Sequence, residues 1–355
     1  MYKFNDYIHY DGGSDIALLK STGLIPSLLW TGGIVLCIIY NTVALEDPST
    51  QQDVHDTGYY QTLQELIDNT SEGAHLLLPP GVYYEHLIVN KSITLKGADN
   101  HSTILNGSGA GIIMYISATN VTLSNCHIEH GNIGIYLKGN NSKKSQVILY
   151  NITITKTNAS MYLSGISNGS LLHSTLEGNV DGITLYHSSY VTLSGNTMRN
   201  NTNTGIGIGD MSHHNTITAN HLILNRQGIR LCRQSHNNTI TGNHLENNTV
   251  GVHSEFTSDT TVTDNVFIHN DCGLRIQHSQ KNNSFFHNVF QENSCAVSMM
   301  GSTEDMQENN TFRNNTMNFK QESSVPQIHT PGYGLAFLLG VIVVVALVRK
   351  ASSFA

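Results

Sequence analysis

The sequence is short of charged residues, which make up 12% of its 355 residues, about half the ~25% usual for globular proteins. It also lacks the excess of Lys and Arg that nucleic-acid-binding proteins carry. Its net charge is −8 at pH 7, so nucleic acid is not an expected partner. Asn, Ser, Thr and Gly crowd the middle of the chain and supply polarity in place of charge. These residues favour turns over helices.

No helical stretch interrupts the middle of the chain, where a pattern of 22 or 23 residues repeats instead. A row of glycines keeps this period, and Ser160 and Ala296 take its place in two repeats. Two rows of asparagines keep the same period. The glycines are Gly111, Gly134, Gly182, Gly205, Gly228, Gly251 and Gly273, and the asparagines are Asn196, Asn220, Asn243, Asn265, Asn288 and Asn310, then Asn201, Asn225, Asn248, Asn270, Asn293 and Asn315.

Each repeat contains three short segments of alternating apolar and polar residues, for example 228–231, 238–241 and 244–246. Such alternation is typical of half-buried strands. A repeat of this size without a helix stacks as a coil, with each strand ~4.8 Å from its counterparts above and below. We therefore expect an all-β, right-handed parallel β-helix over residues 61–318, with about ten coils of three short strands. Residues 63–69 are expected to form a helix that caps its first coil.

The asparagine rows have a structural explanation. At tight corners the backbone enters the left-handed region, which Asn tolerates better than most residues. Stacked Asn side chains can also pair along the rod. We therefore expect both rows to be structural and neither to be catalytic.

Two apolar stretches flank the repeats, and Arg349 and Lys350 follow the second one directly. Lys and Arg next to a membrane segment stay on the cytoplasmic side, so the body between the stretches is expected at the cell surface. Fifteen Asn-x-Ser/Thr sequons agree with that location, although an Asn- and Thr-rich repeat also creates sequons by chance. The expected order is a cytoplasmic segment 1–23, a membrane anchor or signal 24–44, a linker 45–60, the β-helix, a stalk 319–332, a second membrane segment 333–348 and a cytoplasmic tail 349–355.

The segment Leu78-Pro-Pro-Gly-Val-Tyr-Tyr-Glu85, followed by Asn90-Lys-Ser-Ile-Thr-Leu-Lys-Gly97, resembles the opening of pectin-lyase-like β-helix proteins, especially the NosD-type repeat proteins of prokaryotes. The resemblance implies the fold over residues 61–318 and says little of activity, because binding proteins, epimerases, lyases and glycosidases share such coils. The end of the chain, from Pro331-Gly332-Tyr333-Gly334 onward, resembles the PGF-CTERM sorting signal of archaeal surface proteins. That resemblance implies removal by an archaeosortase, and a plain anchor is the alternative.

One exposed strip gathers the residues best suited to bind a ligand. In the strand after each glycine the first and third residues are apolar, so the second and fourth point outward and stack over successive coils. Gly205-Ile-Gly-Ile-Gly209 leaves a shallow notch where a sugar can approach the backbone. A merely solvated strand surface is the alternative interpretation. The predicted ligand-binding face consists of Tyr186, His187, Asp210, Arg230, Arg233, His253, Glu255, Arg275, Gln277 and His278.

Catalytic patterns are mostly missing. Glycoside hydrolysis needs two carboxylates at a set separation, and Asp181 with Asp210 is the conceivable pair; Arg230 and Arg275 are the other candidates. Asn179-Val-Asp181 resembles the Asn-Thr-Asp element of polygalacturonases, and Arg275-Ile-Gln277 lacks the Lys of the lyase Arg-Ile-Lys. The Asp-Pro-His element of alginate epimerases is absent. The His residues are scattered, so we predict no metal site and no cofactor, with copper as the alternative that the NosD resemblance implies.

Two of the five cysteines, Cys272 and Cys295, are 23 residues apart. One coil separates them, so their Cα atoms are expected ~4.8 Å apart, inside the range that a disulfide spans. We expect a vertical disulfide or a stacked thiol pair.

The repeat has almost no insertions that could wall a cleft, which favours binding over catalysis. The preferred function is therefore a non-catalytic cell-surface protein that binds glycans or contributes to the envelope. Its expected partners are the membrane and a surface polysaccharide. The first alternative is a polysaccharide-acting enzyme, namely a lyase, glycosidase or epimerase. The second is a copper-handling accessory protein.

Overall fold

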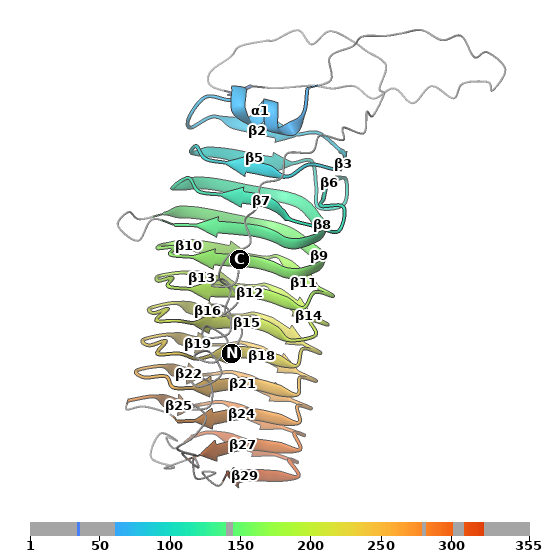
Figure 1. The fold of residues 1–355 in the computed structure, drawn as a ribbon. Coiled ribbons are helices and arrows are strands. Elements are labelled where there is room, and N and C mark those ends of the chain that lie inside the picture. Colours follow the sequence, from blue (N-terminus) through green and yellow to red (C-terminus); the bar gives the residue numbers. More distant parts are fainter. Residues whose placement is uncertain (1–33, 36–60, 140–144, 279–281, 301–308, 323–355) are drawn as a thin grey trace, which may run out of the picture.

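The computed structural model describes residues 34–35, 61–139, 145–278, 282–300 and 309–322. These residues form a rod of stacked coils with the single described helix at one end (Figure 1). All strand pairs between coils are parallel, for example between residues 239–241 and 261–263. The predicted all-β parallel β-helix is therefore confirmed.

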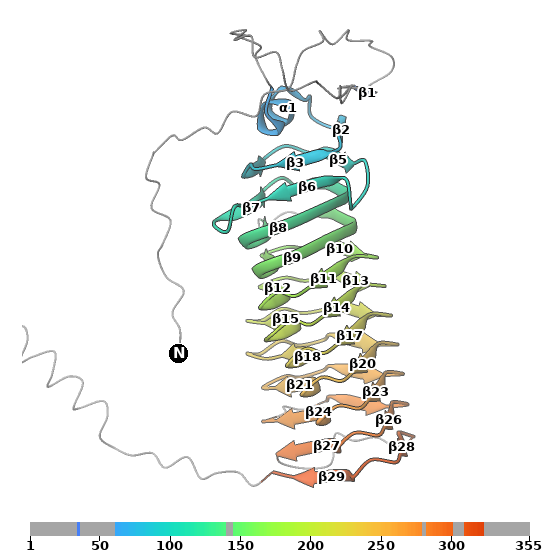
Figure 2. The same cartoon turned by 90° about the vertical axis from the view of Figure 1, so that its right-hand side faces the viewer.

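The strands form three stacks that run the length of the rod (Figure 2). Two long strands, β8 (Asn120–Lys138) and β9 (Gln146–Ser164), pass through all three stacks. The short strand β1 (Ile34–Val35) pairs with β2 (His75–Leu78). The first stack contains β2 (His75–Leu78), β5 (Ile93–Gly97), β10 (Gly169–Leu172), β13 (Thr192–Ser194), β16 (Thr216–Thr218), β19 (Thr239–Thr241), β22 (Thr261–Thr263) and β25 (Ser284–Phe286).

The other two stacks follow in each coil. The second contains β3 (Gly81–Tyr83), β6 (Thr103–Asn106), β11 (Thr175–Glu177), β14 (Thr197–Arg199), β17 (His221–Ile223), β20 (His244–Glu246), β23 (Val266–Ile268), β26 (Val289–Gln291) and β28 (Thr311–Arg313). The third contains β4 (Leu87–Val89), β7 (Ile112–Ile116), β12 (Asp181–Tyr186), β15 (Thr204–Gly209), β18 (Gln227–Leu231), β21 (Val250–Glu255), β24 (Cys272–Gln277), β27 (Cys295–Met300) and β29 (Met317–Gln321).

The interior of the rod is apolar. Inward-facing Leu, Ile and Val alternate with outward-facing polar residues, so β18 buries Ile229 and Leu231 and leaves Arg230 outside. Burial of each such aliphatic side chain stabilises the fold by about 1.5–3 kcal/mol. Phe267 and Phe290 fill the later coils with rings stacked 4.7 Å apart.

The buried asparagines form hydrogen-bonded ladders. The backbone N–H and Nδ2 of Asn220 both donate to Oδ1 of Asn243 at 3.0 Å, and Nδ2 also donates to the carbonyl of Leu193. The predicted pairing along the rod is therefore confirmed. The left-handed backbone, however, lies on the residue before each ladder Asn, as at Ala219 (φ 54°) and Leu224 (φ 57°). Our explanation of the rows by left-handed Asn is wrong, because the corner residue points outward and the ladder Asn points inward.

A third ladder, which the sequence pattern did not predict, runs along the corner before the first stack. Asn215 donates through its backbone N–H and its Nδ2 to Oδ1 of Asn238 at 3.0 Å. Thr260 then donates its N–H to Oδ1 of Asn283. Side-chain amides thus support all three corners of the coil.

The glycine row marks the closest approach of successive coils. A Cβ atom at Gly228, Gly251 or Gly273 would lie 2.5–2.7 Å from a carbonyl oxygen of the next coil, so a side chain there would require the neighbouring backbone to shift. Ser160 and Ala296 occupy the same row, as predicted. Gly111 does not, because Ile112 pairs with Ile133 and the row therefore falls on Ile113.

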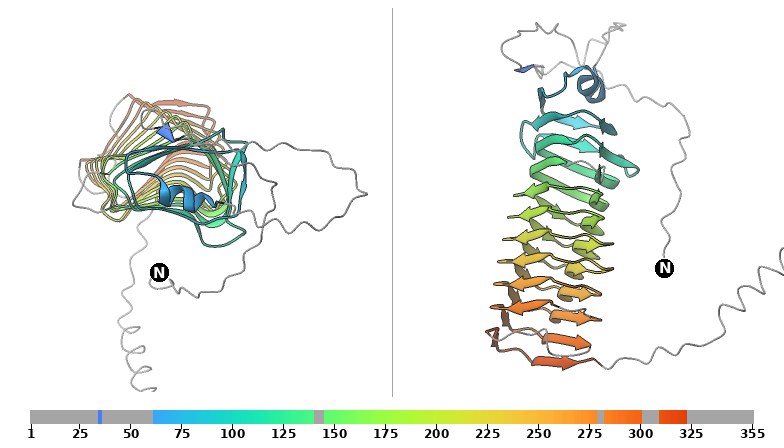
Figure 3. Two further views of the ribbon diagram at one scale, coloured as in Figure 1. Left: turned by 90° about the horizontal axis from the view of Figure 1, so that it is seen from above. Right: turned by 90° about the vertical axis from the view of Figure 1, so that its left-hand side faces the viewer.

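The helix α1 (Leu63–Asn69) closes the first coil with the bounds that the sequence predicts (Figure 3, left). Thr62 and Glu65 form a reciprocal capping box, and the carboxylate of Glu85 accepts the N–H groups of Leu63 and Gln64. These contacts satisfy the free N–H groups of the first helical turn.

The far end of the rod extends beyond the prediction, because β29 continues to Gln321 and takes the first residues of the predicted stalk. Of the predicted segment 24–44, only 34–35 is described, and the segments 333–348 and 349–355 lie outside the described residues, as does the sorting signal. Within the described part of the chain, no helix has the length and apolar character needed to span a membrane.

Candidate functional site

The outward residues of the third stack form two columns, as predicted, and we call this surface the notched face. The pairing of Gly207 with Arg230 and of His253 with Arg275 fixes the register. The first column is Tyr115, Tyr136, Tyr162, Thr184, Gly207, Arg230, His253, Arg275, Ser298 and Lys320. The second column includes Lys138, Ser164, Tyr186, Gly209, Cys232, Glu255, Gln277 and Met300.

Gly207 and Gly209 form the notch, and the backbone does not require glycine at either position. A Cβ atom at Gly207 would meet its nearest neighbour, Thr184 Oγ1, at 3.7 Å, and one at Gly209 would lie 3.4 Å from Cys232 Sγ. Both are ordinary van der Waals distances. The missing side chains therefore leave space that packing between the coils does not demand.

A row of stacked tyrosines lies on one side of the notch. The rings of Tyr115, Tyr136 and Tyr162 are 5.6 and 5.3 Å apart, and Tyr186 continues the row 6.2 Å from Tyr162. Their planes are within 27° of parallel, so neighbouring rings cover each other's faces. Burial raises the pKa of Tyr162 to about 12, which keeps its hydroxyl a hydrogen-bond donor at neutral pH.

Arginines and carboxylates alternate on the other side of the notch. Asp210 is the main reason that the pKa of Arg233 is raised. These are partly exposed ion pairs, each of which contributes about 0–1 kcal/mol. The pairs are Arg233 Nη1 with Asp210 Oδ2 at 3.2 Å, Arg230 Nη2 with Glu255 Oε2 at 3.5 Å and Arg275 Nε with Glu322 Oε1 at 3.4 Å.

His253 joins this half of the face to the last coil. Its Nε2 lies 2.9 Å from Gln277 Oε1, and Gln277 Nε2 donates to Glu322 Oε2 at 2.6 Å. Ser298 Oγ donates to the other oxygen of Glu322. Burial alone would raise the pKa of Glu322, but the bonds from Ser298 and Gln277 and the charge of Arg275 outweigh it and lower that pKa. Glu322 falls in the predicted stalk, so the sequence pattern did not assign it to the face.

The corner that follows the third stack carries a second set of predicted residues. His187, Asp210, Arg233 and His278 all have left-handed backbone there, with φ between 46° and 52°. Their side chains therefore project from the corner beside the columns, and the ring of His278 stacks on Phe256 at 4.7 Å.

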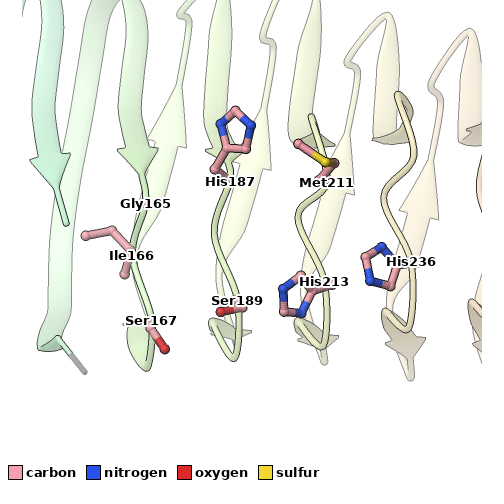
Figure 4. Close-up of a pocket in the computed structure, with 8 residues that line it drawn as sticks. All are labelled: Gly165, Ile166, Ser167, His187, Ser189, Met211, His213 and His236. Carbon is pink, nitrogen blue, oxygen red and sulfur yellow. The ribbon is translucent and has the colours of Figure 1, made fainter. Parts of the chain in front are cut away.

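Two shallow hollows meet at this corner. The first, of about 450 Å³, brings together four predicted residues with three that the sequence pattern missed: Tyr186, His187, Asp210 and Arg233, and Met211, Gln234 and Phe256. The second, of about 390 Å³, shares His187 and Met211 with it and extends past Ser189 to His213 and His236 (Figure 4).

Asp181 lies apart from the other candidates. Its register partner is Thr204, six residues before Asp210, so Asp181 and Asp210 are roughly 20 Å apart along the strand direction. Glycosidases hold their two carboxyl groups about 5–9.5 Å apart. The pair therefore does not have the predicted catalytic geometry. Asp181 instead accepts from Asn203 and from the N–H of Thr204, and burial raises its pKa.

Asn179, in the element that resembles polygalacturonases, belongs to an asparagine ladder. It is buried, accepts the N–H of Thr157 at 2.9 Å and donates to the carbonyl of Ile154. Its role here is structural.

Cys272 and Cys295 pair in register on adjacent coils, as predicted. Both are free thiols in the structure, and each S–H donates to a carbonyl two residues ahead. Burial raises the pKa of Cys272 to about 12. A bond between the two sulfur atoms stays a prediction.

A copper site needs convergent soft or borderline donors. The nearest approach is at His213 and His214, whose Nδ1 atoms are 2.8 Å apart, with the ring of His236 stacked 4.9 Å from His213. Over the described ranges, however, no group of three or more His, Cys, Asp or Glu is arranged to hold a metal ion. The described residues therefore do not fit a copper centre built from these ligands.

Known proteins include a family whose sequence pattern matches this chain. A sequence profile described as "Periplasmic copper-binding protein (NosD)" matches residues 67–272 and 210–330, more than half of the chain. The chain belongs to the NosD family. This member is also 31% identical over 108 residues to a cell surface glycoprotein of Methanothermus fervidus, a match that spans 30% of this chain and 18% of that protein. The NosD-family chain thus corresponds to under a fifth of this relative.

Two solved structures with similar coils are an epimerase module and a polysaccharide depolymerase. The A-module of mannuronan C-5 epimerase AlgE6 from Azotobacter vinelandii superposes with a TM-score of 0.55 at 14% identity, over 74% of this chain and 94% of that module. The tailspike gp49 of Acinetobacter baumannii bacteriophage Fri1, a capsular polysaccharide depolymerase, gives 0.54 at 11% identity, over 75% and 60% of the two chains. Because the sequence identities are this low, the similarity between this NosD-family member and the two solved structures shows only a shared fold.

Proposed function

We propose that this NosD-family protein is an extracytoplasmic surface protein that binds a glycan chain across the notched face without cleaving it. The family description and the cell-surface relative support the location. The observation that carries the binding role is the notch, because Gly207 and Gly209 leave space that the coil geometry does not require. Tyrosine hydroxyls border this space on one side, and arginines and carboxylates border it on the other.

The wide separation of Asp181 and Asp210 along the strand favours binding over hydrolysis by this pair. Asp210, the carboxylate beside the notch, lies 3.2 Å from Arg233, and Asp181 is at the far end of the strand. The hollows at the corner are shallow, so water would reach a bound sugar. A lyase or epimerase is the alternative function, and glycan turnover in the assay below would establish it.

The test fills the notch. Gly207→Tyr has room for its Cβ and should fold normally, whereas Thr218→Tyr places the same side chain outside the first stack as the control. Isothermal titration of the purified protein against a panel of oligosaccharides should find a glycan that wild type and Thr218→Tyr bind equally and Gly207→Tyr binds at least tenfold more weakly. Equal affinity of all three proteins would refute the role of the notch.

Copper handling is the second candidate, and the family description alone favours it, since the described residues do not form a set of metal ligands. Titration of the purified protein with Cu(I) and Cu(II) tests this function directly. Uptake that disappears in His213→Ala would support it, and no uptake at micromolar copper would remove it.

A further inference from the structure

Three buried nitrogen atoms of the notched face have no hydrogen-bond partner: Arg230 Nε, His253 Nδ1 and Arg275 Nε, whose 3.4 Å ion-pair contact with Glu322 Oε1 lacks the geometry of a hydrogen bond. They belong to one column on three consecutive coils. Among the described residues, six buried side-chain nitrogen or oxygen atoms share this condition, so half of them gather at one place. Buried polar atoms of native proteins are nearly always hydrogen-bonded to protein or ordered water, so this cluster marks a place where another molecule can supply the partners.

The surrounding hydrogen bonds decide what His253 can offer. Gln277 Nε2 donates to the carboxylate of Glu322, so Gln277 Oε1 must be the atom that accepts from His253. The proton of the neutral imidazole therefore lies on Nε2, and Nδ1 keeps its lone pair. His253 is 8% exposed, and burial lowers its pKa, which keeps the ring neutral.

The three atoms together match a group that both accepts and donates. An Arg Nε–H can only donate, and Nδ1 of this tautomer can only accept. A hydroxyl group can accept from an Arg Nε–H and donate its own proton to His253 Nδ1. A carboxylate has no proton to donate, and it would face the lone pair of Nδ1.

The charges of the face also disfavour an anionic ligand. Arg230 and Arg275 lie beside Glu255 and Glu322, so an incoming carboxylate would compete with carboxylates already in place. The two columns also contain Lys138, several coils before His253, and Lys320, on the last coil. Neither lysine lies on a coil next to His253.

We propose that the column Arg230, His253 and Arg275 is a subsite for the hydroxyl groups of a neutral glycan. This inference rests on the proposed function, since it assigns a class of sugar to the same face. A hydroxyl enters when the guanidinium of Arg230, whose side chain is 40% exposed, leaves its 3.5 Å contact with Glu255. The hydroxyl then accepts from an Arg Nε–H and donates to His253 Nδ1. The polysaccharide chain continues from there to the notch at Gly207, one coil from Arg230.

The test compares neutral and acidic sugars of equal length on the whole protein. Cellohexaose and mannohexaose are the neutral probes, and hexamers of mannuronate and galacturonate are the acidic ones. A neutral hexamer should bind at least tenfold more tightly than either acidic one, with an affinity that changes less than twofold between 50 and 500 mM NaCl. Tighter binding of an acidic hexamer, weakened by salt, would overturn the inference and leave the proposed function standing. Binding of none of the four would overturn both.

Two substitutions then separate the nitrogens of His253. His253→Asn keeps an acceptor near the position of Nδ1, and His253→Gln keeps a polar group near Nε2 but none at Nδ1. The neutral glycan should bind His253→Gln about tenfold more weakly than wild type, as expected for one lost hydrogen bond, and His253→Asn should recover most of the loss. His127→Gln, on the second stack, is the matched control and should bind like wild type. Equal binding by His253→Gln and wild type would contradict the subsite.

Discussion

Asn243 accepts two hydrogen bonds from Asn220 at 3.0 Å, one from the backbone N–H and one from Nδ2. Replacement of Asn243 by Ala removes the acceptor of both bonds, so the backbone N–H of Asn220 is left unpaired and its Nδ2 keeps only the carbonyl of Leu193. We expect this change to destabilise the protein by about 2–4 kcal/mol, because each buried unpaired group costs about 1–3 kcal/mol. Denaturant unfolding measures the loss. The neighbouring outward substitution His244→Ala is the control, and an equal effect of the two changes would show that the ladder contributes little.

The pH dependence of stability should report on His253. Burial lowers its pKa below the ~6.5 of an unfolded histidine. Between these two values the unfolded chain binds more protons than the folded one, so the contribution of His253 is present above about pH 6.5 and is lost as the pH falls through its folded pKa. Melting temperatures of wild type and His253→Asn should therefore converge on acidification. His221→Asn, at an exposed position of the second stack, is the control, and parallel curves for wild type and His253→Asn would exclude this role.

The corner sequons should carry glycans. Six of them place an exposed left-handed Asn directly before a ladder residue, and along a corner they are never on adjacent coils: Asn200, Asn237, Asn247, Asn282, Asn309 and Asn314. In contrast, Asn106 and Asn151 are only partly exposed. Glycopeptide mass spectrometry of protein from its native cells should find the corner sites occupied more often than these two. Empty corner sites would mean that the sequons are a by-product of the corner chemistry.

The pairing of Cys272 with Cys295 reports the redox state of the last coils. Their in-register positions place the Cα atoms within the span of a disulfide, and we expect the exported protein to contain the bond. Mass spectrometry of unreduced peptides should recover the two peptides joined. In reduced protein, the raised pKa of Cys272 should make its alkylation slow until the fold is denatured. Recovery of both thiols free from the exported protein would contradict the disulfide.

The repeat predicted most of the fold, because a glycine that lets two coils approach and an asparagine that pairs along the rod recur with the same period in most coils. The period also located the notched face, because Gly207, Arg230 and Arg275 lie where it placed them. Tyr162 was missed although a signal was present, since it follows Ser160 as Tyr136 follows Gly134. Phe256 and Glu322 could not be predicted, because a left-handed corner and the last strand put them beside the face.

The most direct test of glycan binding at the notched face is a crystal structure of the protein with the tightest-binding oligosaccharide. The account predicts a sugar chain over Gly207 and Gly209 that extends along the rod toward Arg230 and His253. A sugar bound on either of the other two stacks, or a saturated complex with no sugar over the two glycines, would contradict it.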